Sequence, residues 1–195
     1  MGQQMQGRRI FLAIDISEAA RDVCARHAET LRSLFPKAQV GWTRPDKLHV
    51  TLKFLGDTTD EVLQRLQDPI AEMAAAHRPF PLRLTRAGVF PSRSRPRILW
   101  IGLEDPQARV AEIHHSIETV CKELGYEPEK KSFTPHVTIG RVRGAPSAAA
   151  LADVHLNTRT ESVAFTVSEI VIYESNLQPT GSIYMPLTRV PVPAG

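Results

Sequence analysis

Short apolar runs alternate along the chain with longer stretches in which apolar residues recur at intervals of three and four. Runs bounded by Gly, Pro, Asp or Ser are typical of strands, and the longer spacing is typical of amphipathic helices. The runs predict strands over residues 10–16, 40–43, 48–55, 80–89, 97–103, 133–142, 163–173 and 182–190. The spacing predicts helices over about residues 17–34, 58–73, 105–124 and 147–156. Strands and helices interleave, which indicates an α/β chain.

Three of the predicted helices carry start signals, and Ser17 can cap the helix over residues 17–34. Thr58 stands three residues before Glu61, as in a capping box, and Asp105 is followed by Pro106. We therefore expect Thr58 and Asp105 to be the N-cap residues of their helices. Pro69 falls inside the helix that follows Thr58, where proline removes a helical hydrogen bond, so a kink or a break is expected there.

One short motif occurs twice. His-Val-Thr-Leu at 49–52 recurs 87 residues later as His-Val-Thr-Ile at 136–139, and both copies fall on predicted strands. A long helix is predicted after the first copy and another before the second. This arrangement predicts two similar α/β halves that face one another, each presenting one strand to a common cleft.

Side chains two residues apart on a strand point to the same face of the sheet. His49 and Thr51 therefore share a face, Lys53 joins them by the same alternation, and Phe54 lies on the opposite face. The second copy of the motif is arranged in the same way. If both polar faces line one cleft, the site holds two imidazoles and two hydroxyls.

That set of groups suits cleavage of a cyclic phosphodiester. One imidazole takes a proton from water and the other protonates the departing ribose oxygen, because the ordinary histidine pKa of about 6.5 permits both roles. The hydroxyls of Thr51 and Thr138 can donate hydrogen bonds to the non-bridging phosphate oxygens. A single His-x-Thr strand is usually structural, so it is the pairing of His49 with His136 that supports the hypothesis.

Composition is compatible with such an enzyme. The 195 residues are 42% hydrophobic, with a formal net charge of +3 and a sequence pI near 9.1. We expect one bilobal domain over residues 8–190 and a flexible leader at 1–7. The charge suits a polyanion, as does the arginine run at 93–97, for which a solvated loop is an equal alternative.

Cys24 and Cys121 each lie in a helical apolar pattern. We expect both to be small buried residues rather than disulfide partners, which indicates a reducing compartment. The apolar run at 10–16 is too short for a signal-peptide core or a membrane span. A cytoplasmic protein that does not bind membranes is therefore expected. We also expect a monomer, although these residues do not determine the oligomeric state.

The other histidines do not suggest a metal site. His114 and His115 are adjacent on a predicted helix and diverge, and His27, His77 and His155 lack partners at ligand spacing. The sequence contains neither a P-loop nor a G-x-S-x-G elbow. We expect no metal and no cofactor.

The motifs and their flanks resemble a known family. His49-Val-Thr-Leu-Lys-Phe-Leu-Gly56 and Thr134-Pro-His-Val-Thr-Ile-Gly-Arg141 are similar to the paired motifs of the two-histidine (2H) phosphoesterase superfamily. Within it, they resemble the bacterial and archaeal RNA 2′,3′-cyclic phosphodiesterases, also called 2′-5′ RNA ligases. The similarity extends through segments at 9–15, 98–102 and 168–175 and covers about residues 8–190.

The resemblance implies two pseudo-symmetric lobes, each an antiparallel sheet with outer helices, and an active-site cleft between them. It implies metal-independent hydrolysis of RNA or nucleotide 2′,3′-cyclic phosphate ends to 2′-phosphates. By the same resemblance, His49 is the proton donor to the 3′ oxygen and His136 is the proton acceptor from water. The residues themselves do not rank the two histidines, because the motifs look alike.

Arg141 lies five residues after His136, where relatives often place a substrate contact. Strict alternation would turn it away from His136, so the resemblance and the periodicity disagree. A β-bulge at Gly140 would re-aim it. We therefore expect Thr51, Thr138 and Arg141 to contact the phosphate.

Two rival functions stay open. The same residues could run the reaction backwards and join RNA ends through a 2′-5′ linkage, although abundant water favours hydrolysis unless a second RNA end is held in place. A non-catalytic nucleotide- or RNA-binding module is the other rival. Pure binding does not need a proton donor paired with a proton acceptor, which argues against it.

Overall fold

The computed structural model describes residues 7–144, 147–179 and 181–194, so the expected leader lies outside it except for Gly7. The strands are β1 (Arg8–Asp15), β2 (Gln39–Trp42), β3 (His49–Thr58), β4 (Phe80–Ser92), β5 (Arg95–Glu104), β6 (His136–Gly144), β7 (Ala164–Val167), β8 (Glu169–Asn176) and β9 (Ile183–Pro191). The helices are α1 (Glu18–Leu34), α2 (Asp60–Ala75), α3 (Arg109–Glu123), α4 (Ala148–Asn157) and the short 3₁₀ helix η1 (Pro45–Lys47).

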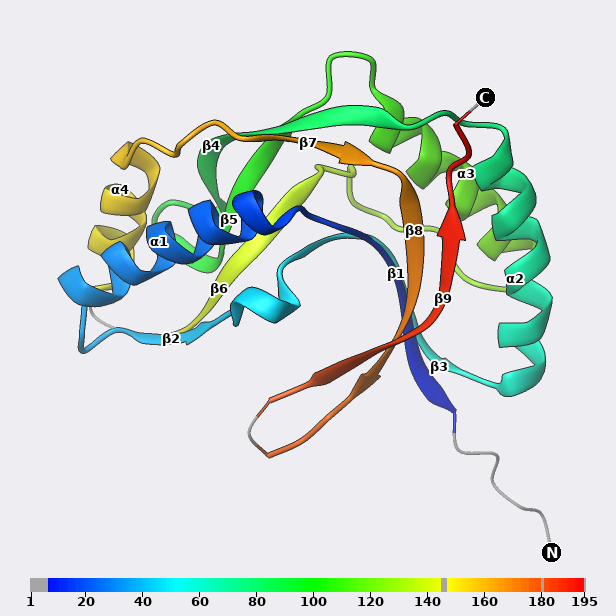
Figure 1. Ribbon diagram of the computed structural model, residues 1–195. Coiled ribbons are helices and arrows are strands. Elements are labelled where there is room, and N and C mark those ends of the chain that lie inside the picture. The colour runs from blue at the N-terminus through cyan, green and yellow to red at the C-terminus, as the bar shows by residue number, and fades with distance from the viewer. Residues whose placement is uncertain (1–6, 145–146, 180, 195) are drawn as a thin grey trace, which may run out of the picture.

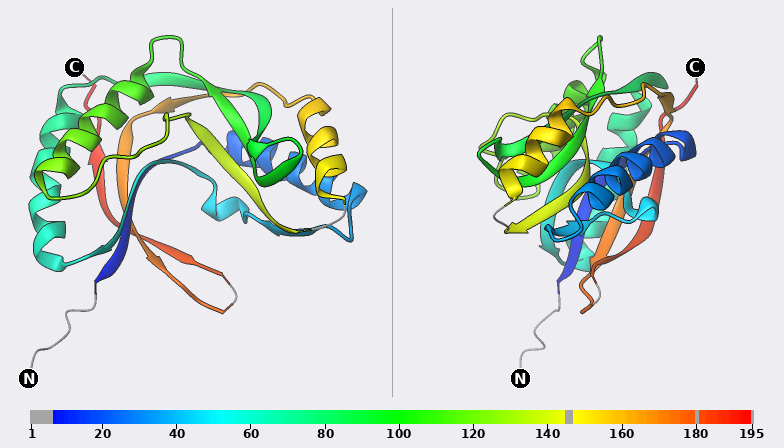
Figure 2. Two further views of the ribbon diagram at one scale, coloured as in Figure 1. Left: turned by 180° about the vertical axis from the view of Figure 1, so that it is seen from behind. Right: turned by 90° about the vertical axis from the view of Figure 1, so that its left-hand side faces the viewer.

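These strands form one curled antiparallel sheet in the order β7-β4-β5-β6-β3-β1-β8-β9, with β2 paired to β6. The two expected sheets meet as one because β3 and β6 pair through Val50 and Val137. Figure 1 shows α1 and α4 over the left half of the sheet and α2 and α3 over the right half. The β8–β9 hairpin projects below. The rear view in Figure 2 shows the same division. The expected fold class is confirmed.

The two halves of the sheet repeat one another. Strands β1 and β5 pair with β3 and β6 in matching register, so that Ala13 lies opposite Thr51 as Trp100 lies opposite Thr138. The helices are exchanged between the halves, because α1 packs against β6 and α4 while α3 packs against β3 and α2. The repeat therefore places both copies of the motif side by side at the centre of the sheet.

One apolar core extends through both halves, from the covered face of the sheet to the inner faces of the helices. Cys24 and Cys121 are fully buried in it and unpaired, as expected. Burial raises the pKa of the Cys24 thiol to about 12 and that of Cys121 to about 11, so both stay protonated.

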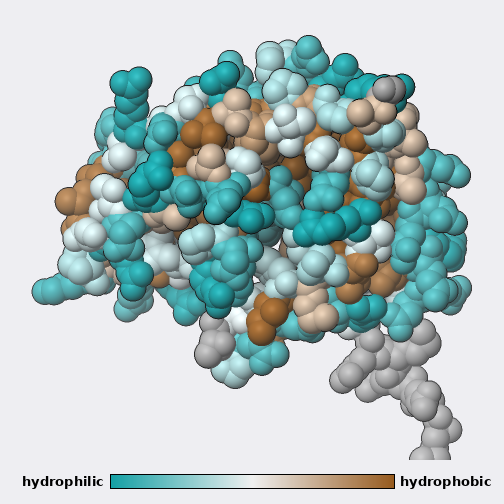
Figure 3. Space-filling view, viewed as in Figure 1, coloured by the Kyte–Doolittle hydropathy of each residue, from teal (hydrophilic) through white to brown (hydrophobic). Residues whose placement is uncertain are grey.

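The surface seen in Figure 3 is mainly hydrophilic, with hydrophobic side chains at the end of the β8–β9 hairpin. Leu177, Ile183 and Met185 are the exposed large hydrophobic residues of this hairpin. Among the described residues, no helix is long and apolar enough to cross a membrane.

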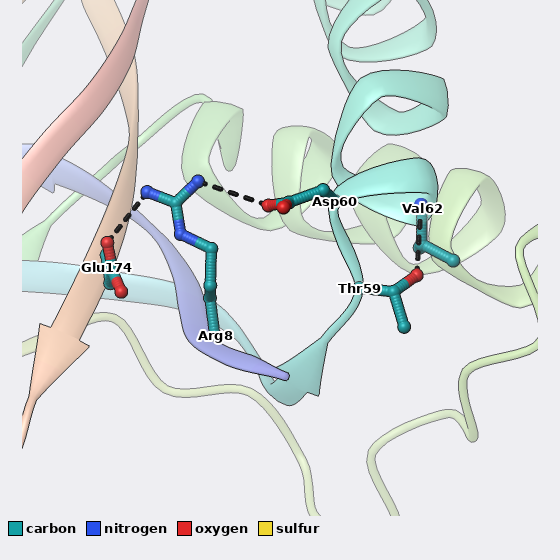
Figure 4. Close-up of polar contacts among 5 residues, drawn as sticks. All are labelled: Arg8, Thr59, Asp60, Val62 and Glu174. Atoms are coloured by element: carbon teal, nitrogen blue, oxygen red, sulfur yellow. Dashed lines mark hydrogen bonds and ion pairs between the residues drawn. The ribbon is translucent and has the colours of Figure 1, made fainter. Parts of the chain in front are cut away.

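Helix α2 begins one residue later than the sequence predicts. Thr59 is the N-cap, and its hydroxyl accepts a hydrogen bond from the backbone N–H of Val62 at 3.4 Å (Figure 4). Thr58 is not the cap because it still belongs to β3, where its buried hydroxyl donates to a carbonyl of the same strand. Arg8 of β1 ties this end of the helix to the sheet, since it pairs with Asp60 and with a glutamate of β8 (Figure 4).

Pro69 lies inside α2, but the helix continues through it without a break. Leu66 and Ile70 on either side are fully buried in the core. Their burial offsets the lost hydrogen bond, because each buried aliphatic side chain contributes about 1.5–3 kcal/mol. Of the kink or break expected at Pro69, the break is wrong for that reason.

Asp105 caps α3 from outside the helix. The N-cap residue is Ala108, in a left-handed conformation with φ of 53°. The Asp105 carboxylate accepts hydrogen bonds from the backbone N–H groups of Arg109 at 3.0 Å and Val110 at 2.7 Å. The predicted N-cap position is therefore wrong, because an intervening turn brings the carboxylate to the helix end.

The single strand expected over 163–173 is two strands. Strand β7 pairs with β4, and β8 pairs with β1 and β9. These partners belong to opposite halves of the sheet, so one straight strand cannot serve both. The chain changes partners at Ser168.

Candidate active site

The motif histidines open the central strands β3 and β6 and are oriented in the same way. The Nδ1–H of His49 donates to the carbonyl of Lys47 at 2.8 Å, and that of His136 donates to the carbonyl of Thr134 at 2.6 Å. A carbonyl oxygen only accepts, so each Nδ1 keeps its proton and Nε2 is the atom that titrates. The Nε2 of His49 lies 3.0 Å from the hydroxyl of Thr51.

Aromatic side chains flank each imidazole. The ring centroids of Phe11 and Tyr184 lie 5.1 and 5.4 Å from the first motif histidine, and those of Phe90 and Trp100 lie 5.2 and 5.8 Å from the second. Burial lowers the pKa of both histidines, and the nearby charge of Arg141 lowers each pKa further. A lowered pKa favours the neutral imidazole that a general base needs and makes the imidazolium a stronger acid.

A β-bulge in β6 re-aims Arg141. The register with β5 shifts between Leu99 and Trp100, and Ile139 and Gly140 are both buried before the alternation resumes. The bulge expected at Gly140 is confirmed. Arg141 consequently returns to the face of the motif histidine and lines a cavity there.

The same bulge occurs at the matching place in β3, where the register with β1 skips Leu52. Lys53 therefore turns into the core, where it is 2% exposed and its Nζ lies 2.6 Å from the carboxylate of Glu118. Phe54 turns the other way, is 46% exposed, and lines the cavity beside His49. The faces predicted for Lys53 and Phe54 are wrong, because the prediction assumed unbroken alternation.

The structure brings the five predicted site residues together where β3 meets β6. His49, Thr51, Thr138 and Arg141 line one cavity of about 250 Å³. His136 lines a second cavity of about 510 Å³, which Thr51 also borders. The two imidazoles are close enough for the charge of one to lower the pKa of the other, since His136 has this effect on His49.

Several residues of the first cavity were not predicted, and Lys47 and Tyr184 are two of them. Lys47 comes from η1 and Tyr184 from β9, and the Lys47 ammonium donates to the carbonyl of Ser182 beside Tyr184. Tyr184 lies in a hairpin that the repeated motif does not reach, so the sequence pattern gave no signal for it. Lys47 could have been suspected from the sequence, because it stands only two residues before His49.

Three of the other residues that drew attention in the sequence contact residues of the fold rather than the site. His27 and His155 are buried as a pair, with Nε2 and Nδ1 2.9 Å apart, and Arg93 of the arginine run pairs with Asp153 on α4. In the part of the chain that the structure describes, no group of three or more His, Cys, Asp or Glu side chains is placed to hold a metal ion.

The chain matches the model of a known protein family. Residues 19–179, which include both copies of the motif, match the model of the 2′-5′ RNA ligase superfamily. The chain belongs to this superfamily. Its relatives within the superfamily include proteins that align over nearly their whole length.

An RNA 2′,3′-cyclic phosphodiesterase of Methanothermobacter thermautotrophicus is 34% identical over 177 residues, which cover 90% of this chain and 94% of that protein. One of Methanocaldococcus jannaschii is 30% identical over 177 residues and is covered to 96% of its length. Among solved structures, E. coli LigT complexed with 3′-AMP superposes with a TM-score of 0.75 at 24% identity, over 96% of this chain and 99% of that one. A protein of Thermus thermophilus superposes with a TM-score of 0.76 at 23% identity, over 95% of this chain and 98% of that one. This member of the 2′-5′ RNA ligase superfamily thus shares its fold with both.

Proposed function

We propose that this chain hydrolyses the terminal 2′,3′-cyclic phosphates of RNA, or the corresponding cyclic nucleotides, to 2′-phosphates. The observation that carries this function is the pairing of His49 and His136, each with Nδ1 bound to a carbonyl and Nε2 left to titrate. The relatives named RNA 2′,3′-cyclic phosphodiesterases support the reaction, and the complex of E. coli LigT with 3′-AMP supports a nucleotide as ligand.

In the proposed reaction, His49 starts as the imidazolium and His136 as the neutral imidazole. His136 takes a proton from water as the water oxygen bonds to phosphorus, and His49 protonates the ribose 3′ oxygen as its bond to phosphorus breaks. The phosphate stays on the 2′ oxygen. Proton exchange with solvent then restores the starting state, so the histidines turn over without a metal.

The remaining three site residues bind the phosphate. Thr51 and Thr138 donate hydroxyl hydrogen bonds to its non-bridging oxygens, and Arg141 adds a positive charge from the same cavity. Negative charge on these oxygens is greatest in the transition state. The three side chains therefore accelerate the reaction rather than merely hold the substrate.

Joining of RNA ends is the second candidate function, and the cavity beside His136 favours it. Its volume of about 510 Å³ is far larger than the roughly 10–15 Å³ that one water molecule needs on the same measure. A ribose 5′-hydroxyl could therefore reach the position from which water attacks. His136 would deprotonate that hydroxyl and His49 would again release the 3′ oxygen, which leaves a 2′-5′ linkage.

We also propose that a single copy of the chain, in the reducing cytoplasm, is the active form. All five site residues come from one chain. The two cysteines are buried without forming a disulfide, which suits a reducing compartment.

The test is product analysis after incubation with a 2′,3′-cyclic nucleotide and a 5′-hydroxyl oligonucleotide, with and without excess EDTA. We expect a 2′-phosphate product at the same rate in both samples. A 3′-phosphate product, or a loss of activity on chelation that a divalent ion restores, would contradict the proposed reaction. A joined product that is resistant to enzymes specific for 3′-5′ linkages would instead support ligation.

A further inference from the structure

The proposed reaction needs two histidines that act differently, although they belong to two copies of one structural unit. Across the β1–β3 pair, the residue opposite His49 is Asp15. Across the matching β5–β6 pair, the residue opposite His136 is Gly102. Asp15 and Gly102 are 87 residues apart, as the histidines are. The two copies thus differ by a carboxylate beside His49.

The carboxylate of Asp15 is fixed on the site face of the sheet. The hydroxyl of Tyr173 donates to its Oδ1 at 2.8 Å, and the guanidinium of Arg189 donates to its Oδ2 at 3.1 Å. Directly opposed residues of antiparallel strands have Cβ atoms about 4.5–5.5 Å apart. Asp15 therefore acts on His49 through space, because the Nδ1–H of His49 is already bound to the carbonyl of Lys47.

The carboxylate of Asp15 shares its guanidinium partner with a second carboxylate. Arg189 is shared between Asp15 and Glu169, which leaves two carboxylates for one guanidinium. Tyr173 stays neutral, because burial and its hydrogen bond to Asp15 raise its pKa to about 12. The positive charge of Arg21, which lies on α1, lowers the pKa of Tyr173 and partly opposes this rise.

The cationic side chains around the cavity do not make the pKa of one histidine differ from that of the other as Asp15 does. Lys47 lines the cavity from η1, where its ammonium is bound to a backbone carbonyl. Arg141 acts on both histidines and lowers the pKa of each. Burial lowers the pKa of His49 most, and the charge of His136 lowers it as well, whereas the carbonyl of Lys47 and the carboxylate of Asp15 raise it.

We propose that Asp15 is a positioning residue that makes His49 the proton donor, by holding the single proton of the active state on His49 and leaving His136 neutral. This inference rests on the proposed function and assigns the two roles that the repeated motif leaves equivalent. Gly102 is its counterpart, since it leaves the second histidine without a facing carboxylate.

The test is an NMR titration of the histidine side-chain nitrogens in the wild-type protein and in Asp15→Asn. In the wild type, the first proton taken up as the pH falls should reside mainly on His49. In Asp15→Asn, the pKa of His49 should fall by about one unit, while that of His136 changes much less. Glu169→Gln is the matched control, because it removes the same charge from the same arginine but lies one strand further from His49.

The pH profile of kcat/KM gives a second readout. Its basic limb reports loss of the donor's proton, so Asp15→Asn should move that limb to lower pH and reduce activity about tenfold on the alkaline side. A purely structural role would lower activity at every pH without moving the limb, and would overturn the inference. Circular dichroism checks that the variant is folded.

Two results would overturn this inference alone: histidines that titrate as in the wild type in folded Asp15→Asn, or a first proton on His136 in the wild type. The wild-type titration decides the matter even if Asp15→Asn does not fold. Absence of cyclic-phosphate hydrolysis by the wild-type protein would overturn the proposed function instead.

Discussion

Each motif histidine is oriented by the backbone carbonyl two residues before it, so its tautomer does not depend on another side chain. A carboxylate partner would fix the tautomer and also shift the pKa. A carbonyl fixes the tautomer without adding a charge. The charge that distinguishes the two histidines can therefore come from a neighbouring residue, which is the part we assign to Asp15.

The threonines are expected to matter less than the histidines. Thr51→Val and Thr138→Val each keep the branched shape and remove one hydroxyl donor. Each should lower kcat/KM by an amount equivalent to about 1–3 kcal/mol, as for loss of one transition-state hydrogen bond. Loss of His49 or His136 should cost about 10²–10⁴-fold, because a proton-transfer group is removed.

Steady-state kinetics with a 2′,3′-cyclic nucleotide compares these variants, with circular dichroism as the folding control. A folded Thr51→Val or Thr138→Val protein as inactive as the histidine variants would contradict this division of roles.

At the scale of single elements, the matched bulges in β3 and β6 decide which side chains reach the site. A bulge inserts one residue without changing the apolar character of a strand, so a period-two pattern does not reveal it. Gly140 gave a hint, because glycine inside a strand often marks a bulge. Lys53 gave none, which is why Phe54 was placed on the wrong face.

Gly140 lets β2 lie close against the bulge in β6. A Cβ at this position would lie 2.9 Å from Cγ1 of Val40 and 3.1 Å from Cε3 of Trp42. Gly140→Ala is therefore expected to destabilise the protein by about 1–3 kcal/mol, as overpacking does, and to lower activity by displacing Arg141.

Gly41→Ala is the matched control on the facing strand. A Cβ there would meet the flexible end of Arg143 at 3.4 Å, which is an ordinary contact. Urea unfolding measures both variants. Equal stability of Gly140→Ala and Gly41→Ala would show that the bulge has more room than the structure gives it.

Helices α1 and α4 are joined by a buried histidine pair. The Nε2–H of His155 donates to the carbonyl of Gly88 at 3.0 Å, so its Nδ1 accepts from the Nε2–H of His27 at 2.9 Å. Burial and the neighbouring His155 lower the pKa of His27 to about 4. The unfolded chain has a histidine pKa of about 6.5 and takes up a proton first. Stability is therefore lost as the pH falls from about 6.5 towards 4.

Urea unfolding at about pH 7.5 and about pH 5 tests this pair. The wild type should lose about 2 kcal/mol of unfolding free energy through His27 at the lower pH. His27→Gln can still donate to His155 but does not titrate, so it should lose less. His115→Gln removes an exposed histidine on α3 and is the control, so it should lose as much unfolding free energy at the lower pH as the wild type. The same loss in His27→Gln as in the wild type would rule out this role for the pair.

At the scale of the whole molecule, the repeat made the fold predictable. The duplicated motif indicated two similar halves and a shared cleft, and the resemblance added antiparallel sheets with outer helices. The exchange of α1 and α3 between the halves was not predictable, because an amphipathic pattern shows that a helix has a buried face but not which sheet covers it.

The candidate site was predictable as far as the repeat and the family resemblance reach, and the resemblance added Arg141. His49, Thr51, His136 and Thr138 stand in the repeated motif, and the structure places them together. Tyr184 stands outside any repeat, and its contact with the cavity depends on how the β8–β9 hairpin returns to the sheet.

The measurement that tests the two-histidine mechanism most directly is kcat/KM across pH with a 2′,3′-cyclic nucleotide. It is made on the wild type, His49→Ala, His136→Ala and the double variant, each checked for folding. One protonated and one neutral imidazole form a single active state, so the wild type should give a bell whose limbs belong to the coupled pair. Each single variant should lose one limb and most of the activity, and the double variant should lose little more. A folded His49→Ala or His136→Ala protein with near wild-type kcat/KM would contradict the mechanism and favour a binding module.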